Sequence, residues 1–113
     1  MERVTMYDLP NNLRLLAGEQ IELAFEGSEK KHNKYVILTN RRLISNAHSL
    51  LSRTTYEILA YQHITRYTVD VKSCKISLSV MGDAGIDISM RVYNFLESDL
   101  FDVEYLLAKN ICR

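Results

Sequence analysis

The chain has 113 residues, of which 47% are hydrophobic and 25% charged, with four Gly, one Pro and a formal net charge of zero. This length and composition are typical of one globular domain with a real core and exclude two full domains. No apolar run approaches the roughly 20 residues that span a bilayer, and the start MERVTMYDLP has no apolar signal segment, so we expect a cytoplasmic protein.

Charge is distributed unevenly along the chain. Residues 1–29 carry two basic and six acidic side chains, residues 30–75 nine basic and two acidic, and residues 76–104 one basic and six acidic. Such blocks predict either a dipolar molecule that meets its partners through charge, or a fold that interleaves the blocks and cancels them. The sequence leaves both interpretations open.

The first 18 residues predict an N-terminal segment with a short helix at about 11–17, ended by Gly18, with Leu13 and Leu16 facing inward. Apolar and polar residues then alternate with a period of two, which predicts strands that have one apolar face each. Such strands belong to an antiparallel sheet over a single core. We expect about seven, at 19–27, 34–39, 42–47, 53–59, 65–72, 74–81 and 85–92.

The segment TNRR at 39–42 interrupts an apolar strand pattern, YVILTNRRLISNA. Asparagine takes a positive φ at low cost, so Thr39 to Arg42 predicts the tight turn of a hairpin with Asn40 in the left-handed region. Arg41 is then exposed at the tip of the turn, and Arg42 begins the next strand. The two arginines therefore mark the end of one strand and the start of another.

The hydrophobic period changes near the C-terminus. Asn94 predicts a helix N-cap, and Leu96, Leu100, Val103, Leu107 and Ile111 recur at spacings of three and four, which predicts an amphipathic helix over 94–112 laid against the sheet. A second apolar line is offset by roughly 120° from the first. It predicts either a wider buried arc or a contact with another subunit. The candidate oligomer contacts are Phe101, Tyr105 and Cys112.

Seven antiparallel strands and one C-terminal helix form the plan of the pleckstrin-homology (PH) superfold, a mostly β, partly open barrel capped by the helix. The segments LAGEQI at 16–21, YVILTNRRLI at 35–44, YEI at 56–58 and ITRYTV at 64–69 resemble the bacterial PH-domain family in order and spacing. The resemblance covers about residues 13–111. It implies a single stand-alone PH-like domain over 1–113, with the barrel at 19–92.

The resemblance also implies a function. Members of the family are generally not enzymes, and some stand-alone members assemble into homo-oligomeric rings. We therefore expect a non-enzymatic binding or scaffold module without a cofactor, whose partner is a second copy of itself or another protein. Head-to-tail contacts could set the basic block 30–75 of one subunit against an acidic block of the next.

The basic loop offers an alternative function. Lys30, Lys31 and Lys34, with Arg41, are candidates to bind an anion, a membrane headgroup or another acidic surface, which would make the chain a peripheral membrane or anion-binding domain. The competing interpretation is a solvated loop, because three lysines are fewer than the four to eight that mark lipid patches. The phosphoinositide motif of eukaryotic PH domains needs an arginine that this loop lacks. Nucleic acid is not expected, since exposed strand positions lack a run of aromatic side chains and the net charge is zero.

No catalytic or metal-binding pattern stands out. The histidines lie in predicted loops or strand ends without zinc spacing, the acidic pair near the last hairpin is predicted to face solvent, and the first cysteine is predicted to be a small core residue. A ligand inside the barrel is not expected, because large side chains are predicted to fill it. The histidines are His32, His48 and His63, the acidic pair is Asp83 and Asp87, the cysteine is Cys74, and the side chains predicted to fill the barrel are Phe25, Ile37, Leu78 and Ile88.

Overall fold

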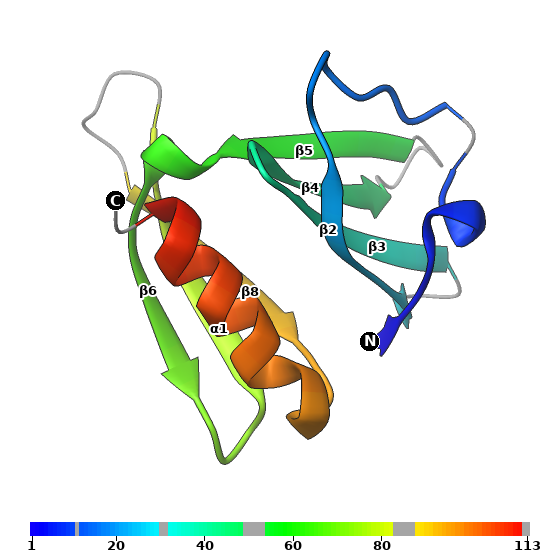
Figure 1. The fold of residues 1–113 in the computed structure, drawn as a ribbon. Helices are drawn as coiled ribbons and strands as arrows, with labels where there is room; N and C mark the ends of the chain where they lie inside the picture. Colours follow the sequence, from blue (N-terminus) through cyan, green and yellow to red (C-terminus); the bar gives the residue numbers. More distant parts are fainter. Residues whose placement is uncertain (11, 30–31, 49–53, 83–87, 112–113) are drawn as a thin grey trace. The chain divides into compact units, whose positions relative to one another are not determined.

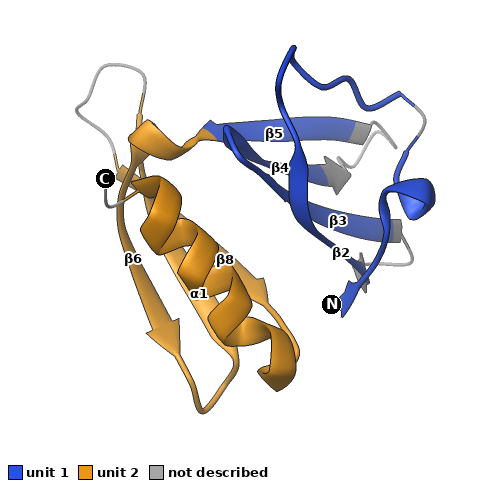
Figure 2. Ribbon diagram, in the orientation of Figure 1, with its two compact units in different colours: residues 1–59 blue, residues 60–113 orange. Residues whose placement is uncertain are grey.

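The computed structural model describes residues 1–10, 12–29, 32–48, 54–82 and 88–111 (Figure 1). Within these ranges the chain forms eight antiparallel strands in two sheets and one C-terminal α-helix, which confirms the predicted mostly β class. The chain divides into two compact units, residues 1–59 and residues 60–113 (Figure 2). The single domain over 1–113 and the barrel over 19–92 stay predictions.

The first unit is built on a five-stranded sheet in the order β1-β2-β3-β4-β5. Its strands are β1 Glu2–Arg3, β2 Ile21–Glu29, β3 His32–Thr39, β4 Arg42–His48 and β5 Thr54–Ala60, and a short 3-10 helix, η1, spans Met6–Asp8. The sequence predicted every strand except β1, whose two residues pair with Phe25 and Glu26 of β2. Two residues are too few for an alternating pattern to be visible.

The N-terminal segment covers one face of this sheet. Leu9 is buried with Ala24, Ile37 and Ile44, and Val4 packs against the same cluster. The opposite face carries a second set of buried side chains: Phe25, Val36, Leu38 and Leu43. The central strands are therefore buried on both faces, which explains the continuous apolar run at 35–38.

The predicted helix at about 11–17 is wrong, because residues 12–17 are not helical. The helical turn lies earlier, at η1, where the backbone N–H and the hydroxyl of Thr5 donate to the Asp8 carboxylate at 3.1 and 2.9 Å. Pro10 ends it, since proline disfavours helical geometry in the residue before it. Leu13 packs inward as predicted, whereas Leu16 is 54% exposed.

The second unit contains the sheet β6-β7-β8 and the helix α1. Its elements are η2 Tyr61–His63, β6 Ile64–Asp70, β7 Lys75–Met81, β8 Ile88–Asn94 and α1 Glu97–Ile111. Alternate residues of β7 are buried, as the period-two pattern predicts, and α1 buries Leu100, Val103, Leu106 and Leu107. The predicted amphipathic helix is confirmed, but it begins at Glu97 and not at Asn94.

The helix lies on one identifiable face of this sheet. Tyr67 is opposite Leu78 in the β6–β7 register, so the two side chains share a face. The Tyr67 hydroxyl donates to the Glu104 carboxylate of α1 at 3.2 Å, and α1 contacts β7. The buried face of the sheet, with Ile76, Leu78 and Val80, is therefore the face beneath the helix (Figure 1).

Several side chains at the ends of these elements differ from expectation. Asn94 is the last residue of β8 and pairs with Lys75 of β7, so it does not cap the helix. Leu96, just before the helix begins, is 48% exposed. Cys74 is half-buried in the turn between β6 and β7, with a φ of 55°, instead of lying in the core. Ile88 is 67% exposed, so it does not fill an interior. The β7–β8 register places it on the face away from the helix, opposite Met81.

Candidate functional site

A buried ion pair joins two motifs that are distant in the sequence. Arg42, at the start of β4, donates from Nε and Nη2 to the two carboxylate oxygens of Glu19 at 2.8 and 3.0 Å. The Glu19 side chain is fully buried, and that of Arg42 is 16% exposed. Two parallel bonds of this kind fix direction as well as charge. The arrangement holds the segment before β2 against the β3–β4 turn.

Neutral donors complete the coordination of the Glu19 carboxylate. The Thr39 hydroxyl donates to it at 2.7 Å and the Leu16 backbone N–H at 2.8 Å. Burial alone would raise the pKa of this carboxyl, but the hydrogen bonds from Arg42, Leu16 and Thr39 and the charge of Arg42 together lower the pKa to about 2. Glu19 is therefore ionised and fully engaged at neutral pH.

The β3–β4 turn is held by side-chain hydrogen bonds. The backbone N–H groups of Arg41 and Arg42 donate to the Thr39 hydroxyl at 3.0 and 2.9 Å, which closes the turn locally. Asn40 exchanges hydrogen bonds with the segment before β2: its amide oxygen accepts the Gln20 N–H at 2.8 Å, and its amide nitrogen donates to the Gly18 carbonyl at 3.2 Å. The side chains of the TNRR segment thus close the β3–β4 turn and attach it to the segment before β2.

The predicted positive φ at Asn40 is wrong. Among the described residues, the positive φ values belong to Gly18 at 78° and Cys74 at 55°. These side-chain hydrogen bonds explain the difference. The Thr39 hydroxyl accepts the hydrogen bonds that close the turn, and the Asn40 side chain bonds to the segment before β2. Gly18 takes the left-handed conformation instead, at low cost because it has no Cβ.

The predicted basic site is only partly described. Lys30 and Lys31 lie outside the described residues. Lys34 is half-buried, and its ammonium group donates to the Asn46 carbonyl across β3 and β4. Arg41 is exposed at the turn, as predicted, and its guanidinium lies above Gly18. Lys34 lies near the start of β3 and Arg41 just after its end, so these two described side chains are not brought together.

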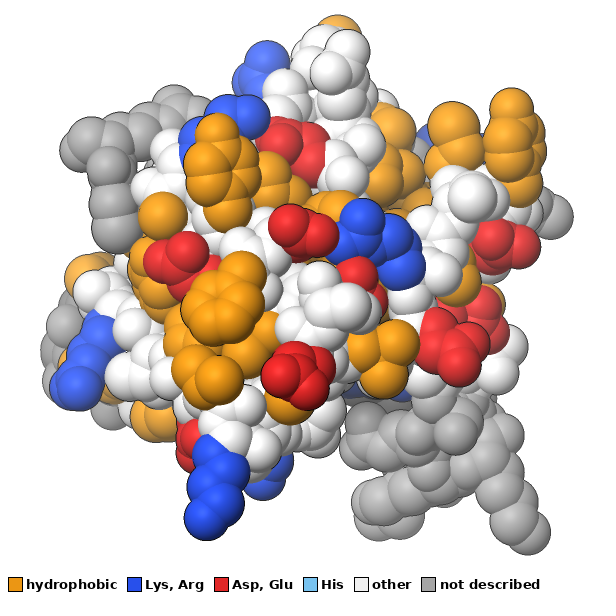
Figure 3. Space-filling view, turned by 60° about the horizontal axis from the view of Figure 1, so that its bottom comes forward, with side chains coloured by type: hydrophobic (Ala, Val, Ile, Leu, Met, Phe, Trp, Pro, Cys, Tyr) orange, Lys and Arg blue, Asp and Glu red, His pale blue; other side chains and the backbone are white. Residues whose placement is uncertain are grey.

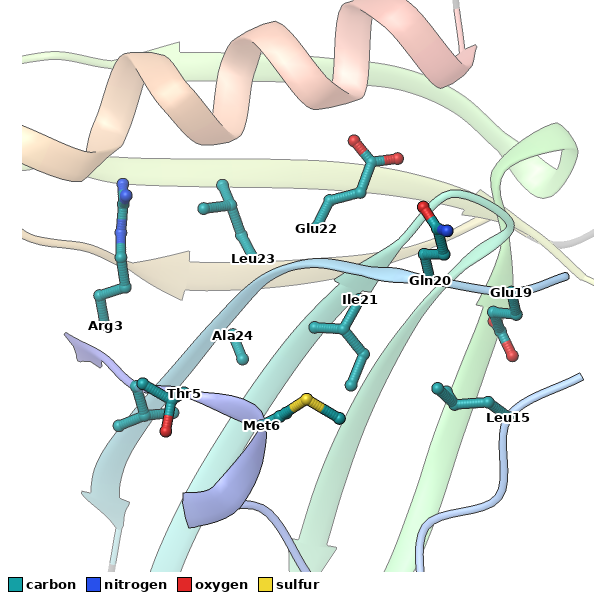
Figure 4. Close-up of a pocket in the computed structure, with 11 residues that line it drawn as sticks. Arg3, Thr5, Met6, Leu15, Glu19, Gln20, Ile21, Glu22, Leu23 and Ala24 are labelled. Atoms are coloured by element: carbon teal, nitrogen blue, oxygen red, sulfur yellow. The ribbon is translucent and has the colours of Figure 1, made fainter.

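An open cavity of about 560 Å³ lies beside β2 in the first unit (Figure 4). Met6, Leu15 and Ile21 point toward one another on one side of the strand, and Leu23 and Glu22 point the other way. Apolar side chains form about half of the lining, and the rest consists of Arg3, Thr5, Glu19, Gln20 and Glu22. Glu19, at its edge, is already engaged by Arg42.

The predicted oligomer contacts on α1 are exposed. Phe101 and Tyr105 lie one turn apart and are 59% and 66% exposed, whereas Cys112 lies outside the described residues. At Phe101 and Tyr105, the second apolar line of the helix is therefore exposed and does not widen the buried face. Figure 3 shows hydrophobic side chains exposed among charged ones on one face of the molecule.

A second exposed apolar surface, which the sequence did not predict, lies on the β6-β7-β8 sheet. It consists of Met81, Ile88, Met90 and Val92, which are 43%, 67%, 58% and 52% exposed. The alternation in 86–92 signalled a strand with one apolar face, but alternation does not tell which face meets solvent.

The described residues hold no group of three or more His, Cys, Asp or Glu side chains placed to bind a metal ion. His63 is exposed at η2, as predicted. The described side chains do not include His32, His48 or the acidic pair Asp83 and Asp87 that was predicted to face solvent. No described helix is long and apolar enough to cross a bilayer.

Comparison with known proteins identifies the fold. The chain matches the crystal structure of a DUF1696 family protein with a pleckstrin-homology domain from Shewanella loihica PV-4, with a TM-score of 0.60 and 16% sequence identity over 97% of this chain and 96% of that one. No family model and no curated protein matches the sequence. The chain therefore has the PH fold, as its sequence motifs implied.

Proposed function

We propose that this chain is a non-enzymatic binding and scaffold module that assembles with copies of itself into a closed homo-oligomer. The observation that carries the proposal is the exposure of Phe101 and Tyr105, 59% and 66%, on a helix whose opposite face is fully buried. Aromatic side chains contribute large apolar area to protein interfaces and are enriched there. A helix that presents two of them outward offers a docking surface.

The PH fold supports the non-enzymatic part of the proposal, since this fold is typically used for binding. The chemistry of Glu19 agrees with it. A carboxyl whose pKa is lowered to about 2 stays ionised near neutral pH and is a weak base, so Glu19 is unsuited to general acid–base catalysis. Its four hydrogen bonds serve the fold instead.

Light scattering after size-exclusion chromatography tests the assembly. At micromolar protein, we expect a mass that is an integer multiple of the monomer mass and the same across a tenfold range of concentration, because a closed ring has a fixed number of subunits. The measurement is made at low and at high salt to weigh charge against apolar contact. A monomer at both salts would contradict the proposal.

A second candidate, anion or membrane-surface binding, rests on the exposure of Arg41. It is the weaker of the two, because Lys34 is engaged by the Asn46 carbonyl. Co-sedimentation with anionic phospholipid vesicles at low salt tests it, with Arg41→Ala as the matched variant. Binding that the variant loses would favour this function, and failure of the wild type to bind excludes it.

A further inference from the structure

The edge of β2 in the first unit is only partly covered by β1. The two residues of β1 pair with Phe25 and Glu26, and just after β1 the Val4 N–H donates to the Ala24 carbonyl at 2.9 Å. Beyond this bond the N-terminal segment turns away from β2 into η1. The start of β2, at residues 21–23, therefore extends past the end of β1.

The open cavity of the first unit lies where β1 would continue. Its lining includes every residue from Glu19 to Ala24, and neighbouring side chains of a strand point to opposite faces of the sheet. Figure 4 shows this at Ile21 and Glu22, which point to opposite sides of the strand. A space that borders both faces lies beside the edge of the strand. The cavity is therefore a groove along β2, which we call the β2 groove.

The backbone of β2 directs hydrogen-bonding groups into this groove. The Gln20 N–H donates to the Asn40 amide oxygen at 2.8 Å, and the Gln20 carbonyl accepts the Asn40 N–H at 3.0 Å, so the backbone groups of Gln20 face the β3–β4 turn. The Ala24 carbonyl faces the other way, toward Val4. Because the backbone groups of successive strand residues alternate in direction, those of Ile21 face the groove.

One side of the β2 groove is apolar. Met6, Leu15 and Ile21 point toward one another there, and Met6 and Leu15 are 63% and 39% exposed. Exposed apolar side chains that gather at an open cavity are typical of a binding site. A strand edge beside such a cluster offers both features that β-strand addition uses, since backbone hydrogen bonds give affinity and a pocket for every second side chain gives specificity.

The charges around the β2 groove favour a basic occupant. Apart from Glu19, which is neutralised in its ion pair, the charged residues of the segments that border the groove are Glu2, Arg3, Asp8, Arg14, Glu22 and Glu26, four acidic and two basic. Glu2 and Glu26 are directly opposite each other in the register of β1 and β2, where like charges repel. A cation close to this pair relieves the repulsion.

We infer that the β2 groove binds an extended segment of another protein, which continues the line of β1 along β2. Every second side chain of this segment is apolar and packs on Met6, Leu15 and Ile21, and basic residues flank it. Residues 21–24 span roughly 13 Å at about 3.3 Å per residue, and the β-bulge between Ile21 and Leu23 limits regular pairing, so about four residues of the segment pair with β2.

This site is independent of the proposed self-assembly. Every residue that lines the β2 groove belongs to the first unit, whereas the exposed aromatic side chains that carry the proposed assembly lie on α1. A small apolar molecule would fill the cavity without using the backbone of β2. The experiment must therefore separate backbone pairing from apolar contact alone.

Three fluorescein-labelled peptides serve as probes, Lys-Val-Thr-Val-Thr-Val-Lys and its versions with Leu or Phe at the three Val positions. We expect saturable binding of at least one of them to the wild-type chain, measured by fluorescence anisotropy, with a Kd on the order of 100 µM because the paired segment is short. If none of the three binds at millimolar protein, the inference is overturned.

Two N-methylated forms of the best probe test the backbone pairing. One carries N-methyl groups at the apolar positions and the other at the threonines, so each form loses the N–H groups along one edge of the extended peptide. Only one edge faces β2, so we expect one form to bind about tenfold more weakly than the probe and the other to bind equally well. Equal affinity of both forms overturns the inference, because the peptide then enters as an apolar ligand only.

Two neighbouring residues of η1 test the location. Met6→Ser removes an apolar side chain from the lining, and we expect it to weaken binding of the probe about tenfold. Tyr7→Ser is the matched control, because Tyr7 is 91% exposed and does not line the groove. Both positions are exposed, so both variants should fold. Equal losses of affinity from the two variants, or none from Met6→Ser, overturn the assignment to the β2 groove.

Light scattering on the same samples separates this site from the proposed function. We expect the mass of the wild type to increase only by the mass of the bound peptide. A monomeric wild type that binds the probe contradicts the self-assembly and leaves the β2 groove in place. If the probe binds only by dissociating an assembly, a second copy of this chain occupies the edge of β2, and the assignment of another protein is wrong.

Discussion

At the scale of single residues, the Glu19 carboxylate organises the first unit. It accepts four hydrogen bonds, from Leu16, Thr39 and twice from Arg42. Arg42 in turn donates from Nη2 to the Arg14 carbonyl at 3.0 Å. One buried carboxylate thus links the segment before β2 to the β3–β4 turn, and its removal leaves a largely buried guanidinium without its counter-charge.

Replacement of Glu19 by glutamine tests this role. Glu19→Gln removes the negative charge and keeps the size, and we expect it to lower the free energy of unfolding by about 3 kcal/mol, as for a buried ion pair that loses one partner. Urea unfolding followed by circular dichroism measures the change. Glu2→Gln, at an exposed position, is the control and should change stability by less than about 0.5 kcal/mol.

The same pair makes stability depend on pH. The pKa of Glu19 is lowered in the folded protein from 4.5 to about 2, so its contribution is fully present above pH 4.5 and is lost as the pH falls toward 2. We expect the difference in unfolding free energy between wild type and Glu19→Gln to shrink by about 3 kcal/mol over this window. A difference that stays constant from pH 7 to pH 2 would contradict the lowered pKa.

At the scale of elements, α1 has one face in the core and one in solvent. Leu107 is 1% exposed and Phe101 is 59% exposed, although both are large apolar residues of the same helix. Packing, and not the hydrophobicity of the residue, therefore decides what each side chain contributes to stability.

Alanine substitutions on the two faces should separate these contributions. Leu107→Ala should lower the free energy of unfolding by about 2–5 kcal/mol through lost burial and the cavity left behind. Phe101→Ala should change the stability of the isolated subunit by less than about 0.5 kcal/mol. Thermal or urea unfolding under conditions that keep the subunits apart measures both. Equal losses from the two variants would mean that the helix is oriented differently.

The turn between β6 and β7 places Cys74 at a φ of 55°, in the left-handed region. Asparagine tolerates this conformation, whereas β-branched side chains do not. We therefore expect Cys74→Asn to be as stable as wild type or slightly more so, and Cys74→Val to lose about 1–2 kcal/mol. Denaturant titrations of the two variants decide this, and a valine variant as stable as wild type would show that the turn is not strained.

At the scale of the whole molecule, the order of elements was predictable because each strand and the helix has its own local hydrophobic periodicity. Seven strands and the helix follow from alternation and from spacings of three and four, and the motifs at 16–21 and 35–44 pointed to the PH fold. Those motifs are also the ones that the structure joins, since Glu19 belongs to the first and Thr39 and Arg42 to the second.

What could not be predicted depends on tertiary contacts. Glu19 and Arg42 are 23 residues apart, and no local pattern marks two charged residues as a buried pair. Alternation marked Ile88 and its neighbours as one face of a strand, but the register of β8 against β7 decides which face is buried. The second apolar line of the helix predicted either a wider buried arc or a contact with another subunit, and periodicity alone does not decide between them; Phe101 and Tyr105 prove to be exposed.

The charge blocks of the sequence are partly interleaved by folding. Arg42 of the basic block is neutralised by Glu19 of the acidic block that precedes it. Arg41, Arg66 and Lys75 of the same basic block are exposed, which leaves them available for contacts between molecules. In the proposed assembly, these charges would steer association, and the exposed aromatic side chains of α1 would supply apolar contact.

A crystal structure of the assembled protein tests the central claim, self-assembly through the second unit, most directly. We predict copies related by a closed rotation, with Phe101 and Tyr105 of each copy buried against a neighbouring copy. Contacts that leave these aromatic side chains in solvent in every copy would contradict the claim.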